Sequence, residues 1–257
     1  ERFKTIGKWW WKILWHYEKF IHQKADFTFC ITTEDRDYFL KKYGIPFQKS
    51  SVITYGIPWN CIPSTIEKAE AKNYLLKKYS LPSGTRLFLF NGTLDYVPNL
   101  NAIRNIVEKI NPLFITKNIG YKIIICGKGL PAEMNELRDY SNQNIIYAGF
   151  VDDISIYFNG ADVFINPVND GGGIKTKLVE SLGYNLNVVS TLNGAIGVDK
   201  NICNGKLFLC ENTNWKTFSD KMEIALDLYQ DIPSEFFEHF YWENIVAQAA
   251  EIINDLN

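Results

Sequence analysis

The chain has 257 residues, with 27 Lys and Arg against 29 Asp and Glu, so its net charge at pH 7 is −2. This balance gives no global reason to expect nucleic acid or another polyanion as a partner, and any anion site must be local. The length fits one large domain, or one domain with a piece of another.

The first patterned segment, KWWWKILWHYEKFIHQKAD at residues 8–26, has the spacing of an amphipathic helix. Its apolar face carries Trp9, Ile13, Tyr17, Phe20 and Ile21, and Lys8, Lys12 and Lys19 lie opposite. We favour a helix that packs on protein outside this chain. Trp11 and Trp15 lie beside the lysines, which is also the pattern of a membrane-surface helix, so a peripheral membrane contact is the alternative.

The next segment predicts strand, helix and strand. FTFCIT and SSVITYG have the apolar content of strands, and the helix between them has Thr33 as its expected N-cap and Gly44 as its stop. Two strands of a parallel sheet cannot cover both of their own faces. We therefore expect residues 1–57 to be the remnant of an α/β domain whose beginning is absent.

Residues 58–235 alternate apolar strands with amphipathic helices, which predicts one complete doubly wound α/β domain with a parallel sheet. The expected strands are 86–92, 121–127, 144–149, 161–167, 187–191 and 206–211, and the expected helices are 66–79, 99–110, 131–141, 153–160, 174–184 and 214–230. Residues 236–257 hold a last amphipathic helix at 240–255, which either caps this domain or reaches back to the first.

The cysteines and histidines show no metal-binding pattern. The five cysteines are odd in number, widely spaced and lack C-x-x-C spacing, which fits a reducing compartment. The three histidines share no ligand spacing either, so we predict no metal. Nothing resembles a signal peptide, and no apolar run approaches the ~20 residues that cross a bilayer. We expect a cytoplasmic protein, soluble or peripheral.

A triple glycine lies between a predicted strand and a predicted helix, in the stretch NDGGGIKTKLVES. In open α/β sheets ligands bind beyond the carboxyl ends of the strands, and amide groups at a helix N-terminus attract anions. Lys175 and Lys177 add mobile positive charge and Thr176 a hydroxyl donor. The pattern predicts a phosphate or pyrophosphate site.

Glu180 lies three residues beyond Lys177, on the same side of the predicted helix. A carboxylate there is badly placed for phosphate and well placed to accept hydrogen bonds from a ribose diol. The alternative is a tight turn followed by a solvated face with an ordinary Lys177–Glu180 pair. A second motif, GKG at Gly127–Gly129, lacks the third glycine and the acidic residue of a dinucleotide site, so it is a weak nicotinamide signal.

Several motifs in this order resemble a known family: FLFNGTLDYVPNLNAI, KIIICGKG, NIIYAGFVDD, ADVFINPVNDGGGIKTKLVESLGYNLNVVST and NGAIG. Together they resemble the C-terminal half of retaining glycosyltransferases of the group 1 type (family 4, GT-B fold). The resemblance covers residues 27–257, and its specific motifs lie between Gly92 and Gly197. It implies two Rossmann-like domains facing each other across a cleft, with the C-terminal one holding a sugar nucleotide.

The resemblance also implies residue roles. The turn from Gly171 through Gly172, Gly173, Ile174 and Thr176 would hold the donor diphosphate, with Gly92, Thr93 and Gly127 also at the donor. Gly149, Phe150 and Val151 would line the base pocket, and Glu180 would take the ribose. Lys177 and Lys175 would stabilise the leaving diphosphate, and Asp170 would contact the sugar hydroxyls unless it is only a turn residue.

The chain departs from the family pattern at two places. Many members have two glutamates eight positions apart; Glu180 matches the second, and Gly172 occupies the first position. Many also have an Arg and a Lys after the Gly92 turn, and residues 93–99 contain neither. The acceptor-binding N-terminal domain is expected to be mostly outside this chain, which alone would then be inactive.

The expected function is transfer of a sugar from a nucleoside diphosphate sugar to a glycan or lipid-linked acceptor, with retention of configuration, in cell-surface glycan synthesis. We expect no cofactor, no metal and no nucleic acid partner, and a location in the cytoplasm or at the inner face of the cytoplasmic membrane. The alternatives are a non-catalytic nucleotide-sugar-binding subunit that needs a partner domain, a sugar-nucleotide epimerase and an NAD-dependent enzyme.

Overall fold

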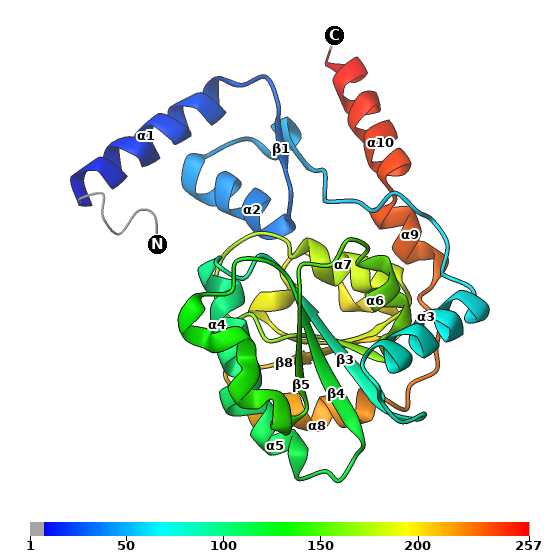
Figure 1. Ribbon diagram of the computed structural model, residues 1–257. Helices are drawn as coiled ribbons and strands as arrows, with labels where there is room; N and C mark the ends of the chain where they lie inside the picture. The colour runs from blue at the N-terminus through cyan, green and yellow to red at the C-terminus, as the bar shows by residue number, and fades with distance from the viewer. Residues whose placement is uncertain (1–7, 257) are drawn as a thin grey trace.

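The computed structural model describes residues 8–256, and the side chains of Lys8 and Trp9 lie outside the description together with residues 1–7 (Figure 1). It holds a two-stranded and a six-stranded sheet, the latter in the order β5-β4-β3-β6-β7-β8, and every pairing is parallel. The strands are β1 Thr28–Cys30, β2 Ser50–Val52, β3 Arg86–Asn91, β4 Tyr121–Cys126, β5 Ile145–Gly149, β6 Val163–Asn166, β7 Asn187–Thr191 and β8 Leu207–Cys210. The predicted α/β class is confirmed.

Helices cover both faces of the six-stranded sheet, and a separate apolar cluster fills each interface. One face carries α3 Thr65–Lys78, α6 Ser155–Gly160, α7 Thr176–Gly183 and α9 Ser234–Phe240. The other carries α4 Val97–Asn105, which continues through a π-helical turn into α5 Asn111–Ile115, and α8 Trp215–Ala225. Because both faces are covered, the central strands β3 and β6 are nearly continuous apolar runs.

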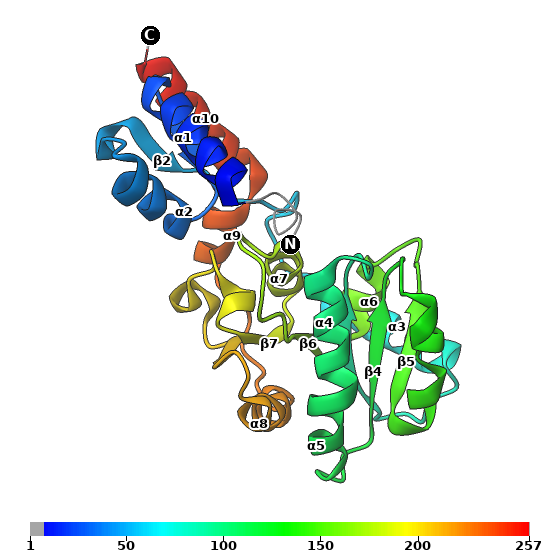
Figure 2. The same cartoon turned by 90° about the vertical axis from the view of Figure 1, so that its left-hand side faces the viewer.

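The N-terminal part lies at one end of the molecule, with α7 and α9 between it and the six-stranded sheet (Figures 1 and 2). It contains α1 Lys8–Lys24, β1, α2 Thr33–Tyr38 with a π-helical turn after it, and β2. The predicted N-cap was wrong by one residue: the hydroxyl of Thr32, not Thr33, accepts from the Asp35 backbone N–H at 3.1 Å. Gly44 ends the helical stretch in the left-handed conformation, as predicted.

The apolar face of α1 is exposed: Ile13, Tyr17, Phe20 and Ile21 are each at least 40% accessible. Trp15, in contrast, is turned into the N-terminal part, where its indole N–H donates to the Tyr38 hydroxyl at 3.1 Å. Because Trp15 already contacts protein within this chain, this contact argues against a membrane role for that residue. No helix within residues 8–256 has the length and apolar character to cross a membrane.

One helix prediction differs from the structure. Residues 131–141 do not form one helix, because Asn135, Glu136 and Leu137 have positive φ angles of 46°, 50° and 55° inside a run of 3₁₀ turns. Met134, Leu137 and Tyr140 contact the core at intervals of three residues, which is the period of a 3₁₀ helix and not of an α-helix.

The last predicted helix, residues 240–255, is confirmed as α10 Trp242–Asp255, and a helix that the sequence did not predict, α9, precedes it. Helix α9 buries Phe236, Phe237 and Phe240 in the core, and the extended residue Tyr241 separates the two helices. At this break the Ile57 N–H donates to the Phe240 carbonyl at 2.7 Å, and the Trp242 N–H donates to the Ile57 carbonyl at 3.1 Å. The segment thus caps the larger sheet and also holds the connector between the two sheets. The domain boundaries at residues 57 and 235 remain predictions.

Candidate functional site

The turns after β3, β4 and β5 are joined to one another at the carboxyl edge of the sheet. The Gly92 N–H donates to the Cys126 carbonyl at 3.1 Å, and the Gly127 N–H donates to the Gly149 carbonyl at 2.7 Å. Gly127 has a φ of 146°, and a Cβ atom there would overlap the Gly92 carbonyl oxygen. Only glycine fits at Gly127, so this close approach of the turns depends on it.

A cavity of about 360 Å³ opens at these turns. Its lining includes five residues that the sequence assigned to a donor site: Gly92, Thr93, Gly127, Phe150 and Val151. Phe150, Val151 and Ile154 give it an apolar wall, and its size and walls suit a flat ring. Gly149 is not part of the lining and contributes through its hydrogen bond to Gly127.

The triple glycine forms an open turn that Lys175 braces. Gly171 and Gly173 have positive φ angles of 80° and 71°, and a Cβ atom on Gly172 or Gly173 would meet nothing within 4 Å. The Lys175 ammonium donates to the carbonyls of all three glycines at 3.0–3.1 Å. The prediction of a mobile charge at Lys175 was therefore wrong, because its ammonium is fixed on the turn's carbonyl groups.

Helix α7 begins immediately after this turn, and no side chain caps its N-terminus at Lys175. Its first turn contains no acidic residue, so the positive end of the helix dipole faces the turn without an opposing carboxylate from the helix itself. Thr176 is exposed at this end, whereas Ile174 packs against the core of the larger sheet.

Lys177 is held beside the Gly92 turn. Its Nζ donates to Asn99 Oδ1 at 2.6 Å and lies 4.7 Å from the centre of the Phe90 ring. A Cβ atom on Gly92 would come within 2.9 Å of that Nζ, and Asn99 also donates to the Thr93 carbonyl at 2.8 Å. Lys177 thus connects the glycine-turn helix to the apolar cavity, and the prediction of a mobile charge was wrong here too.

The Lys177 ammonium lacks a counter-charge in the described part of the chain. Part of the side chain is accessible, but the ammonium lies deep among protein atoms, and no ion pair within 4.0 Å involves it. Burial first, and then the charge of Lys175, lowers the pKa of Lys177 to about 7, while Glu180 opposes the shift. A bound anion would supply the missing counter-charge.

Glu180 pairs with a residue from the connector between the sheets. The Tyr55 hydroxyl donates to Glu180 Oε1 at 2.7 Å. The alternative of an ordinary Lys177–Glu180 ion pair is therefore wrong, since Lys177 turns to Asn99. The sequence pattern gave no sign of Tyr55 or Asn99, because 125 and 78 residues separate them from their partners.

Only one of the two carboxylate oxygens of Asp170 has a hydrogen-bond partner in the described chain. Its Oδ2 accepts from the Asn101 side chain at 2.9 Å, while Oδ1 is buried and has no protein partner among residues 8–256. The adjacent Gly171 lies near Pro98 and Tyr96 at the start of α4, close to Asn99 in the chain. The turn, Asp170 and the Lys177 ammonium therefore gather around the start of one helix.

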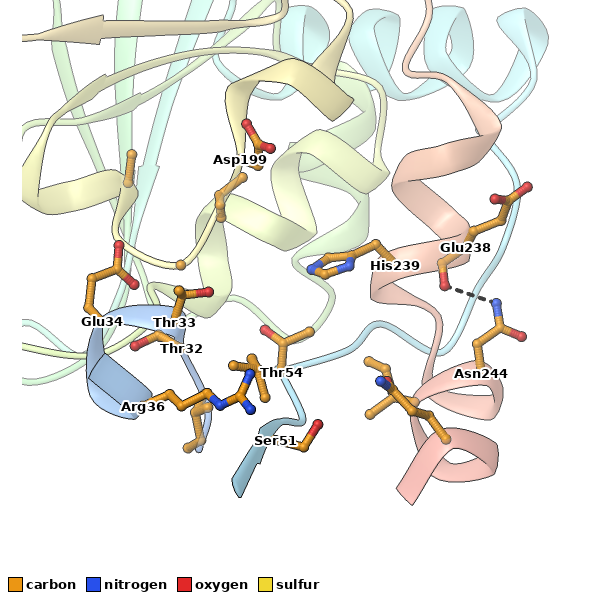
Figure 3. A pocket seen from close by; sticks show the side chains of 17 residues that line it. Thr32, Thr33, Glu34, Arg36, Ser51, Thr54, Asp199, Glu238, His239 and Asn244 are labelled. Carbon is orange, nitrogen blue, oxygen red and sulfur yellow. Dashed lines mark hydrogen bonds between the residues drawn. The ribbon is translucent and has the colours of Figure 1, made fainter. Parts of the chain in front are cut away.

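A separate cavity of about 610 Å³ lies between the N-terminal part, the loop 195–199 and the junction of α9 and α10 (Figure 3). The Arg36 guanidinium is engaged, donating to the Ser50 hydroxyl at 3.1 Å and the Ser50 carbonyl at 2.6 Å. The Thr54 hydroxyl is buried and has no protein partner in the described chain. The polar lining also includes Thr32, Thr33, Glu34, Ser51, Asp199, Glu238, His239, Asn244 and Gln248.

The described residues contain no group of three or more His, Cys, Asp or Glu side chains that could hold a metal ion. Positive groups near the glycine turn include Lys175, Lys177 and the start of α7.

Comparison with known proteins gives a family and a fold. Residues 85–227 match the family described as Glycosyl transferases group 1. An uncharacterized 44.6 kDa protein in the cps region of Klebsiella pneumoniae is 26% identical over 162 residues, and the match spans 58% of this chain and only 42% of that protein.

Solved structures are similar over nearly the whole chain. A glycosyltransferase from Rickettsia africae has a TM-score of 0.73 and 16% identity, covering 95% of this chain and 67% of that one. Anabaena HepE in complex with UDP has a TM-score of 0.73 and 13% identity, covering 95% and 68%. WaaG, a glycosyltransferase involved in lipopolysaccharide biosynthesis, has a TM-score of 0.60 and 15% identity, covering 88% and 62%.

Proposed function

Because the chain belongs to the group 1 glycosyl transferases, we propose that it takes a sugar from a nucleoside diphosphate sugar and transfers it to a glycan or lipid-linked acceptor. The resemblance seen in the sequence is confirmed at the level of the family and of the GT-B fold. Retention of anomeric configuration, membership of family 4 and the identity of the donor are part of the proposal.

The observation that carries the proposal is the Lys177 ammonium, buried beside Gly92 with a neutral amide as its hydrogen-bond partner. A buried cation without a counter-ion is unfavourable, and a diphosphate would relieve that cost. Lys177 lies in the first turn of α7, so the open glycine turn and the uncapped start of that helix directly precede it in the chain. This arrangement supports a diphosphate between the turn and Lys177.

The other parts of a donor have complementary surroundings. We assign the base to the 360 Å³ cavity, where Phe150 and Val151 offer apolar contact. We assign the ribose to Glu180, whose Oε2 has no hydrogen-bond partner among residues 8–256. The unpartnered Asp170 Oδ1 would accept from a sugar hydroxyl.

The proposed chemistry is stabilisation of the leaving diphosphate. As the bond to the anomeric carbon breaks, negative charge develops on the diphosphate oxygen, and fixed donors aimed at it lower the barrier. Lys177 and the amide groups at the start of α7 would supply these donors. Lys175 would act indirectly, by holding the carbonyl groups of the turn in place. We propose that these groups suffice without a metal.

The 610 Å³ cavity is our proposal for an acceptor region. Carboxylates of Glu34, Asp199 and Glu238 accept hydrogen bonds, and Thr54 and Asn244 offer hydroxyl and amide groups, a mixture that suits a hydroxyl-rich glycan. The relative in a cps region supports a role in cell-surface glycan synthesis. We propose that this occurs in the cytoplasm at the inner membrane face. The exposed apolar face of α1 would pack on protein outside this chain, and a membrane contact is the alternative. Under that alternative, replacing Tyr17 and Phe20 by Ser would reduce binding to anionic vesicles.

Calorimetric titration with UDP, GDP, ADP and NAD tests the donor proposal. We expect one nucleoside diphosphate to bind, and Lys177→Met to weaken it at least about tenfold, as loss of a hydrogen bond to a charged group does. Binding of NAD alone would contradict the proposal. This chain alone is expected to bind donor and transfer nothing, and adding the N-terminal half would restore transfer only if that half comes from a true enzyme. NMR of the resulting product would report retention or inversion directly.

A further inference from the structure

We propose that the Tyr55 hydroxyl positions the Glu180 carboxylate and so sets the preference of the donor site for ribose over deoxyribose. The inference rests on the proposed function, because it takes Glu180 as the residue that receives the ribose. It adds a specificity-determining residue that lies outside the larger sheet, in the connector that follows β2.

The contact itself is short and directional. Tyr55 Oη donates to Glu180 Oε1 at 2.7 Å. Burial, and next the hydrogen bond to Glu180, raises the pKa of Tyr55 above its ordinary value, so the phenol stays protonated and acts as a donor. With Oε1 occupied, Oε2 is the oxygen left to accept from a ribose hydroxyl.

Tyr55 is anchored well enough to impose an orientation. Its ring packs edge-on against Trp242 at 5.8 Å between centroids. The next residue, Gly56, is so tightly packed that a Cβ atom there would lie 2.7 Å from Ile245. One residue further, Ile57 is hydrogen-bonded to the backbone on both sides of the break between α9 and α10. The hydroxyl is thus a fixed donor.

Glu180 needs such an anchor, because nothing else in the described chain orients it. It lies on α7, three residues after Lys177, whose ammonium turns to Asn99. No ion pair within 4.0 Å involves Glu180. Without Tyr55 the carboxylate would sample several rotamers and lose entropy on binding, which weakens recognition of the diol.

Replacing Tyr55 by Phe tests the inference, since it removes the hydroxyl and retains the ring. The readout is the ratio of the Kd for 2′,3′-dideoxy-UDP to the Kd for UDP, or the same pair for GDP or ADP if that base binds tighter. In the unmodified protein we expect a ratio of about ten or more, from hydrogen bonds between a carboxylate and the diol. Tyr55→Phe should lower the ratio at least about threefold by weakening UDP while leaving the dideoxy form unchanged.

Tyr79→Phe is the matched control. It also removes a partly buried phenol hydrogen bond, to Tyr157 at 2.9 Å, and this phenol does not contact Glu180 in the described chain, so the ratio should stay unchanged. Thermal unfolding of both variants shows whether they fold equally well. An unchanged ratio in Tyr55→Phe overturns the inference. Tighter UDP binding also overturns it, because Tyr55 would then compete with the ribose for Glu180.

Glu180→Gln separates the inference from the proposed function. If Glu180 holds the ribose, this variant lowers the ratio, because hydrogen bonds from the diol to a neutral amide are weaker than those to a carboxylate. If it keeps the ratio of the unmodified protein, the ribose role of Glu180 is wrong, and the inference falls with it. If Glu180→Gln lowers the ratio and Tyr55→Phe does not, Glu180 still binds the ribose and only the proposed role of Tyr55 is wrong.

Discussion

The lowered pKa of Lys177 predicts that nucleoside diphosphate binding weakens as the pH rises above 7. In the free protein the pKa of Lys177 is about 7, so raising the pH removes the charge that attracts the diphosphate. A bound diphosphate favours the ammonium and raises that pKa, so binding at alkaline pH must take up a proton.

The magnitude follows from the fraction of Lys177 that is charged. With a pKa of about 7, roughly 24% is charged at pH 7.5 and roughly 1% at pH 9. The affinity should therefore fall about 20-fold between these values, or about 2 kcal/mol. The terminal phosphate, with a second pKa near 6, is already ionised over this range and contributes little to the change.

Calorimetry at pH 7.5, 8 and 9, in buffers of different ionisation enthalpy, measures both the affinity and the proton uptake. At pH 8 we expect uptake of about 0.9 proton per nucleotide. Lys177→Arg keeps its charge throughout and should flatten the affinity curve, and Lys177→Met should be weak and flat. A constant affinity in the unmodified protein, or uptake near zero at pH 8, would refute the reasoning.

The same residue affects stability with a defined sign. Its pKa is lower in the folded than in the unfolded state, whose ordinary value is 10.5, so the unfolded chain binds more protons between pH 7 and about 10. The contribution of Lys177 to the free energy of unfolding therefore becomes more favourable as the pH rises through that window. Chemical denaturation at pH 7 and pH 9 measures this effect. The free energy of unfolding of the unmodified protein should rise relative to that of Lys177→Met between the two pH values.

Further expectations concern side chains and turns around the site. Asn99→Leu removes the neutral partner of Lys177 and should weaken nucleotide binding about tenfold by titration calorimetry. Gly127→Ala should destabilise the fold by more than about 3 kcal/mol in urea unfolding, because its Cβ has no room; a smaller loss would mean that the turns can separate. Gly172→Ala, which meets open space at an ordinary φ, should stay within about 0.5 kcal/mol of the unmodified protein in the same assay. Lys206→Met leaves the buried Asn187 Oδ1 and the partly buried Gln230 carbonyl without their ammonium donor and should cost about 1–3 kcal/mol, and a gain in melting temperature would contradict this.

Local patterns accounted for most of the larger sheet. Strands such as β3 and β6 are apolar runs because both faces are covered, and the helices between them carry one apolar stripe, so both are readable from spacing alone. The exceptions are a segment with a different apolar period and a short helix that packing defines. In residues 131–141 the core contacts recur every three residues, and the extended residue Tyr241, which pairs with Ile57, separates the unpredicted α9 from the last helix.

By itself the sequence determined the α/β class, the order of the glycine turns and the family, because each depends on residues close together in the chain. Only the tertiary structure decided which groups meet. Lys177 turns to Asn99 instead of Glu180, and Glu180 turns to Tyr55, because side chains from different elements compete for the same partners once the core has packed. Such pairings depend on the relative placement of whole elements, which no local spacing encodes.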